Sequence, residues 1–87
     1  MNGDVTVSDL EDVLVRKYAR LSARLRDAAD YLRAHQIDVA TRSLRVISEQ
    51  SGIAPATFSR LARALEFEDY EAMREVLRRA LGRKSPS

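Results

Sequence analysis

The sequence predicts a small all-α protein, an orthogonal bundle of about five helices that contains a helix-turn-helix. Apolar residues return at three- and four-residue steps throughout, and the strict alternation of a strand is absent. Only two of the 87 residues are proline, so few positions forbid a helix. We expect one domain with a modest core over residues 1–82, followed by a flexible tail or the start of a linker over 83–87.

The N-terminal third contains either one helix or two. A first helix is expected from Ser8, because Ser8 and Glu11 have the spacing of a capping box. Its inward side consists of Leu10, Val13, Leu14 and Tyr18. A second helix is expected after Ser22 as N-cap, with an inward stripe of Leu25, Ala28, Ala29 and Leu32. The apolar residues of 14–32 also follow a heptad pattern, so one continuous helix over 8–34 fits equally well.

The remaining elements flank a central pair of helices. Residues 35–41 lack a helical stripe and are expected to connect two helices, with Val39 turned inward. A last helix is expected after Asp69 as N-cap, with Gly82 as its stop. Its C-terminal turns carry Arg78 and Arg79, and its inward side consists of Tyr70, Met73, Val76, Leu77, Ala80 and Leu81.

Residues 43–65 have the pattern of a helix-turn-helix. Ser43 is the expected N-cap of a first helix, whose inward side consists of Leu44, Ile47, Ser48 and Ser51. Gly52 adopts a positive φ at no steric cost, which suits a tight turn, and Ile53 fills the corner. Pro55 fits the first turn of a second helix, whose inward side consists of Phe58, Leu61, Ala62 and Leu65.

The outward side of this second helix predicts a DNA-binding face. It carries small, hydroxyl and guanidinium side chains: Ala56, Thr57, Ser59, Arg60 and Arg63. Such a face can lie in the major groove, with Arg60 as the expected base contact. Arg42, Ser43 and Arg45 are expected to hold the DNA backbone. An ordinary helical hairpin with solvated arginines has the same spacing, so the spacing alone does not decide.

Charge is distributed unevenly along the chain. The formal net charge is only +2. Residues 16–33 hold six basic and two acidic residues, and residues 41–65 hold four arginines and one glutamate. The flanking segments, 1–15 and 66–75, are acidic. A basic face between acidic flanks is typical of a modest DNA-binding module, although interleaved charge on any helical protein can look similar.

Residues 21–82 resemble the N-terminal DNA-binding domain of the MurR/RpiR family of bacterial transcriptional regulators. The shared marks, in order, are Leu21-Ser22, Ala28-x-x-Tyr31-Leu32, Ser43-Leu44, Ile47-Ser48, Ser51-Gly52-Ile53, Ala56-Thr57-Phe58-Ser59-Arg60-Leu61, Arg63-x-Leu65, Phe67-x-x-Tyr70 and Met73-Arg74. No single mark is specific, but their joint order and spacing are. The resemblance implies a sequence-specific regulator that binds double-stranded DNA.

Three positions depart from the family pattern. Ser48 stands where alanine is usual, and its hydroxyl can bond back within the helix. Ala54 replaces the usual serine before the recognition helix, which removes an N-cap bond worth roughly 1 kcal/mol. Glu66 replaces the usual glycine after that helix, which either abolishes the left-handed exit or leaves it mildly strained.

Members of that family usually carry a C-terminal sugar-isomerase-like (SIS) domain that senses phosphosugars, and 87 residues leave no room for it. The chain is therefore expected to be either the excised DNA-binding part of such a regulator or a stand-alone protein. We expect no small-molecule effector site within it. The absence of cysteine and of a long apolar run fits a cytoplasmic protein without a membrane span.

The residue set argues against an enzyme, a cofactor and a metal site. His35 is the single histidine, cysteine is absent, and Asp27 and Asp30 are expected on a solvated helix face. The alternative function is a helical protein-interaction or dimerisation module, favoured by the heptad pattern over 14–32 and by an outward Val46. We also expect a weak homodimer, in which the first helix packs partly against a second copy.

Overall fold

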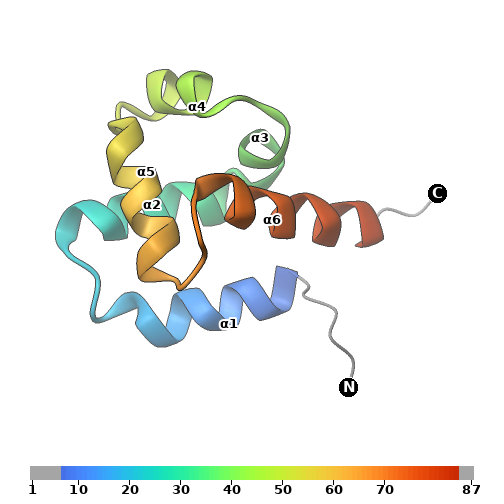
Figure 1. Cartoon of the computed structure of the whole chain (residues 1–87), viewed down its shortest axis with the longest axis horizontal. Coiled ribbons are helices and arrows are strands. Elements are labelled where there is room, and N and C mark those ends of the chain that lie inside the picture. Colours follow the sequence, from blue (N-terminus) through green and yellow to red (C-terminus); the bar gives the residue numbers. More distant parts are fainter. Residues whose placement is uncertain (1–6, 85–87) are drawn as a thin grey trace.

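The computed structural model describes residues 7–84, which form six α-helices and no strand. The helices are α1 (Val7–Tyr18), α2 (Ala23–Ala34), α3 (Gln36–Thr41), α4 (Leu44–Ser51), α5 (Pro55–Ala64) and α6 (Tyr70–Lys84). The predicted all-α class is confirmed, with one helix more than expected. Helix α5 packs on α2 and α6, α3 packs on α6, and α1 runs across the side of the bundle away from α4 (Figure 1).

A single core joins the described helices. Its fully buried side chains include Leu14, Leu32, Ile47, Phe58, Leu61 and Met73. Phe58 lies at its centre and contacts the ring of Tyr31 from α2 and the ring of Tyr70 at the start of α6, each edge-on. The apolar stripes predicted for the helices therefore point inward, with Val13, Tyr18, Leu25 and Leu44 at the margin of the core. The exception is Val76, which was predicted on the inward side of the last helix but is half-buried and not among the residues packed against the core.

The N-terminal third forms two helices, because side chains satisfy both ends of a break over residues 19–22. Arg26 donates from Nε to the Tyr18 carbonyl (3.2 Å) and from Nη2 to the Ala19 carbonyl (3.0 Å). Ser22 caps α2 as predicted, accepting the N–H of Leu25 at 3.3 Å. Leu21 is buried within the break. The heptad spacing thus comes from two helices that share one core.

Residues 36–41 form α3, so the expectation of an irregular connection over 35–41 was wrong. The helix has six residues, too few for a periodic stripe to be visible in the sequence. Val39 is buried as expected, and Ala40 is buried beside it. Arg74 of α6 donates to the Val39 carbonyl at 3.3 Å, which fixes α3 against α6.

Helix ends agree with the sequence at some positions and differ at others. Asp69 caps α6 as predicted, accepting the N–H of Ala72 at 2.8 Å. Gly82 does not stop α6, which continues to Lys84 across the expected boundary at 82. Helix α1 begins at Val7, so Ser8 lies inside it rather than at its N-cap. The side chains of the predicted capping box at Ser8 and Glu11 lie outside the described ones.

Candidate nucleic-acid interface

A three-residue turn joins α4 to α5. Ser43 caps α4 as predicted, accepting the N–H of Val46 at 3.2 Å. Gly52 ends the helix in the left-handed region with φ of 75°, and its N–H donates to the Ser48 carbonyl at 2.9 Å. Pro55 occupies the first turn of α5, and Ala54 at the N-cap offers no side-chain hydrogen bond. Two helices with a short glycine-containing turn are what the sequence predicted for this segment.

Two serines fix the turn from the last residues of α4. The Ser48 hydroxyl donates to the Ile53 carbonyl at 2.6 Å, across the turn. The expectation that it would bond back within its own helix was therefore wrong. Ser51 accepts the N–H of Ile53 at 3.1 Å. Both bonds hold Ile53 against the core, and they define the direction in which α5 leaves the turn.

The outward side of α5 presents four of the five predicted side chains. Ala56, Arg60 and Arg63 are exposed and Ser59 is half-buried. Thr57 is only 6% exposed, so its assignment to the groove-facing side was wrong. The physical reason is helical geometry, because Thr57 lies one turn before Leu61 and faces the same way.

Thr57 instead lines a small hollow of about 90 Å³ between α2 and the turn, together with Arg24, Asp27, Gly52 and Ile53. Arg24 was counted in the basic segment 16–33 but was given no role by the sequence. Its position beside the start of α5 depends on how α2 packs on α5, which no local pattern reveals.

The residues expected to hold a DNA backbone lie at the start of α4. Arg42 ends α3 and pairs with Asp38, with Nε and Oδ1 3.3 Å apart. The exposed Arg45 pairs loosely with Glu49 at 3.7 Å. Ser43 is exposed, and its oxygen is engaged as the cap of α4. Val46 is half-buried rather than exposed, which removes it as an indication of a partner surface.

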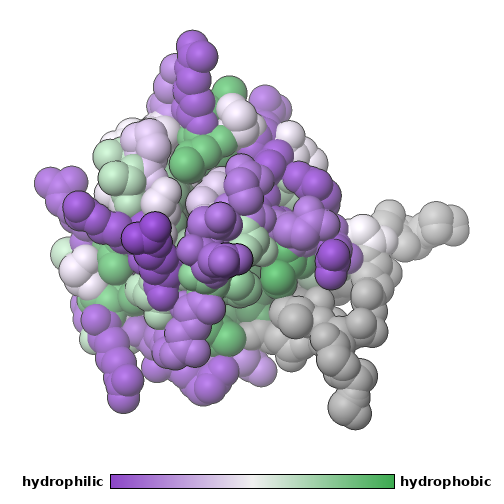
Figure 2. Space-filling view, viewed as in Figure 1, coloured by the Kyte–Doolittle hydropathy of each residue, from purple (hydrophilic) through white to green (hydrophobic). Residues whose placement is uncertain are grey.

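The arginines of α5 differ from those of the neighbouring helices. Ion pairs join acidic residues to Arg42, Arg45, Arg74, Arg78 and Arg79. Within residues 7–84, neither Arg60 nor Arg63 has an ion pair or a side-chain hydrogen bond, and α5 contains no acidic residue. Figure 2 shows the hydrophilic character of the face seen in Figure 1, where hydrophobic groups occur in scattered patches. Arg60 and Arg63 therefore give the outward side of α5 a positive charge that no described acidic side chain pairs with.

The chain leaves α5 through a strained residue. Glu66 has φ of 73°, the left-handed region that favours glycine, so the left-handed exit is present and not abolished. The Glu66 carboxylate accepts a hydrogen bond from Nζ of Lys17 at 2.8 Å, which ties the exit to α1. This hydrogen bond and the charge of Lys17 lower the pKa of Glu66. The pair therefore stabilises the fold above the ordinary pKa of a glutamate, and this contribution is lost as the pH falls through the lowered value.

We expect Glu66→Gly to raise the melting temperature by a few degrees, because glycine adopts a positive φ without strain. The matched variant Glu66→Ala loses the same ion pair but keeps the strain, so its melting temperature should fall slightly or stay the same. Thermal unfolding followed by circular dichroism compares the two. A Glu66→Gly chain that melts no higher than Glu66→Ala would contradict the strain.

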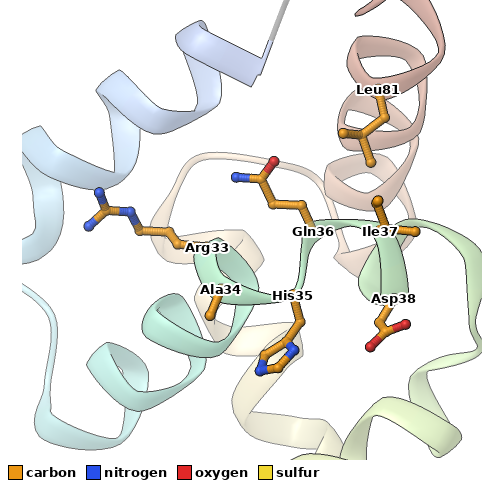
Figure 3. Close-up of a pocket in the computed structure, with 7 residues that line it drawn as sticks. All are labelled: Arg33, Ala34, His35, Gln36, Ile37, Asp38 and Leu81. Carbon is orange, nitrogen blue, oxygen red and sulfur yellow. The ribbon is translucent and has the colours of Figure 1, made fainter. Parts of the chain in front are cut away.

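Another hollow lies away from α5, at the junction of α2 and α3. Its volume is about 610 Å³, and its lining residues are Arg33, Ala34, His35, Gln36, Ile37, Asp38 and Leu81. Ile37 points toward Leu81 of α6, whereas the His35 ring points away from both (Figure 3). The ring of His35 stacks on that of Tyr31 at 4.2 Å, which gives it a structural role. These side chains do not converge on one point as an acid–base site requires.

Two further features bear on the type of site. Among the side chains described, no three His, Cys, Asp or Glu residues gather in a way that could hold a metal ion. Within the described part of the chain, no helix combines the length and apolar character needed to cross a membrane.

Comparison of the chain with known protein families, with curated proteins and with solved structures gives no match.

Proposed function

We propose that this chain binds double-stranded DNA sequence-specifically, with α4, the turn and α5 acting as a helix-turn-helix. The observation that carries the proposal is the outward side of α5, where Arg60 and Arg63 are exposed and lack acidic partners within residues 7–84. Unpaired guanidinium groups on a rigid helix are available to an anionic partner at no cost of broken ion pairs. The proposal does not depend on the family resemblance.

In this arrangement α5 lies in the major groove. Arg60 donates to the O6 and N7 acceptors of a guanine, and the small side chains of Ala56 and Ser59 allow α5 to approach the bases closely. Arg42, Ser43 and Arg45 contact phosphates and fix the register of α5 without reading sequence. The ion pairs of Arg42 and Arg45 are exposed and weak, so they open readily toward a phosphate.

The resemblance to MurR/RpiR regulators extends the proposal to transcription regulation in a bacterial cytoplasm, where the chain would be the DNA-binding part of a phosphosugar-responsive regulator. The sensing function belongs to another domain in that family. Phosphosugars should therefore leave the DNA affinity of these 87 residues unchanged. A DNA titration with and without a panel of phosphosugars checks this.

The decisive measurement is binding to duplex DNA as a function of salt. If the chain binds DNA, the logarithm of its affinity should fall linearly with the logarithm of the salt concentration. A pure protein-interaction module should bind no DNA at any salt concentration. Selection of bound duplexes from a random library then gives the operator. A chain that binds selected and unrelated duplexes equally well would contradict sequence specificity.

We further propose a weak homodimer through α1. Leu10 and Leu14 are buried in the chain's own core, so they do not require a partner. Val15, which is 59% exposed on the outer side of α1, is the residue that a second copy would cover. Two copies would place recognition helices on half-sites about 34–36 Å apart, or a multiple of that distance.

Sedimentation at high micromolar concentration should detect the dimer, and Val15→Asp should abolish it by placing a charge in the interface. Ile37→Asp is the matched control, because Ile37 is the other large exposed apolar residue of the described chain, at 68%, and lies on α3. A strictly monomeric unmodified chain would contradict the dimer, and equal effects of both variants would contradict the role of α1.

A further inference from the structure

The hollow between α2 and the start of α5 contains a polar group that lacks a partner. Thr57 is only 6% exposed, and no hydrogen bond joins its hydroxyl to another described residue. Tyr70 holds the only fully enclosed side-chain polar atom without a partner in the described part of the chain, so the Thr57 hydroxyl is not sealed in the core. The hydroxyl is therefore open to the hollow and is available to a ligand that enters it.

The first turn of α5 has a free donor next to Thr57 in the sequence. Ala54 offers no side-chain cap, and Pro55 has no N–H. The Thr57 N–H donates to the Ala54 carbonyl at 3.0 Å, while the Ala56 N–H has no partner within residues 7–84. The positive end of the ten-residue helix α5 therefore lies near the hollow, which Thr57 of its first turn lines.

Arg24 supplies positive charge from α2. It is exposed, lines the hollow, and forms no ion pair with any described residue. Asp27, one turn further along α2, also lines the hollow and opposes an anion. The hollow, with a volume of about 90 Å³, has room for a tetrahedral anion.

We infer that this hollow binds one phosphate of the DNA backbone, with the Arg24 guanidinium and the Thr57 hydroxyl as its donors. The inference rests on the proposed function and extends its interface to α2, a helix outside the α4–α5 unit. A phosphate held at the first turn of α5 fixes how deeply that helix enters the groove. Thr57 thus acts on the DNA backbone and not on the bases.

The first test compares Arg24→Gln with Arg79→Gln, which removes the same charge from an exposed arginine of α6. Both full-length variants are titrated with a duplex of unrelated sequence over a range of salt concentrations. Arg24→Gln should lower the slope of log affinity against log salt by about 0.9, the value for one phosphate contact, and Arg79→Gln should leave it unchanged. Equal slopes for Arg24→Gln and the unmodified chain overturn the inference.

The second test concerns the hydroxyl. Thr57→Val keeps the shape and removes the donor, so DNA affinity should fall several-fold with little change in the salt slope. Thr57→Ser keeps the donor and should restore most of the affinity. A loss shared by both variants overturns the role of the hydroxyl. Asp27→Asn should strengthen binding, because it removes a negative charge from the hollow.

A third measurement separates a DNA phosphate from free phosphate. Inorganic phosphate is titrated into the chain without DNA, and the amide signals of Ala56 and Thr57 are followed by NMR. A DNA phosphate site predicts weak shifts that Arg24→Gln abolishes, together with the DNA result above. Phosphate binding by a chain that binds no duplex overturns both the assignment to DNA and the proposed function. Duplex binding that depends on Arg60 but not on Arg24 overturns this inference alone.

Discussion

Phe58→Ala should lower the free energy of unfolding by about 3–5 kcal/mol, the usual cost of removing a buried phenylalanine. The side chain is fully buried, and its ring contacts Tyr31 at 6.3 Å and Tyr70 at 6.2 Å between centroids. Its removal therefore opens a cavity where α2, α5 and α6 meet. For a domain of this size the melting temperature should fall by roughly 12–40 °C, measured by circular dichroism.

The other phenylalanine of the chain provides the control. Phe67 follows α5, is half-buried, and packs against the margin of the core. Phe67→Ala removes the same atoms from a site that already contacts solvent, so its melting temperature should fall much less. Small domains hold about 5–15 kcal/mol in total, and the Phe58 variant would lose a large share of that. Equal shifts for the two variants would mean that Phe58 is not the centre of the core.

The sequence predicted the fold wherever local chemistry decides the structure. Serine and aspartate side chains cap helices at Ser22, Ser43 and Asp69, and each cap forms a hydrogen bond in the structure. The break between α1 and α2 was left open, because the residue that satisfies the end of α1 is Arg26, eight positions after Tyr18. Apolar periodicity contains no information about such a bond.

Two predictions about helix bounds were wrong, the irregular connection over 35–41 and the helix end at Gly82. Helix α3 is held by its packing on α6, and Gly82 stays helical because nothing in the sequence requires a positive φ there. Gly52, in contrast, ends its helix as expected, with φ of 75°. A glycine permits a helix end but does not impose one.

The candidate interface was predicted in outline and not in detail. The exposure of Arg60 and Arg63 follows from the period of an α-helix, and the structure confirms it. Thr57 was placed on the wrong side, because polar character was given more weight than its position one turn before Leu61. Arg24 lies 33 positions before Thr57 in the sequence, and only the packing of α2 on α5 brings it to the same hollow.

Arg60→Ala should cost about 1–3 kcal/mol of binding to a selected duplex, the discrimination that a bidentate contact to guanine provides. Arg60 is exposed on the outward side of α5, one turn from Ala56 and from Arg63, where its guanidinium can reach a base edge. Binding to an unrelated duplex should change much less, because a base contact adds little there. Equilibrium titration of both duplexes at one salt concentration measures the difference.

Two further arginines separate base reading from phosphate binding. Arg42→Ala should weaken binding to the selected and unrelated duplexes alike, and should reduce the salt slope by about one unit, because Arg42 is assigned to the DNA backbone. Arg79→Ala, on α6, should change neither affinity, since Arg79 pairs with Glu75 away from α5. If Arg60→Ala lost the same affinity on both duplexes, Arg60 would be a phosphate contact. The base contact would then have to come from Arg63, the remaining unpaired guanidinium on the described outward side of α5.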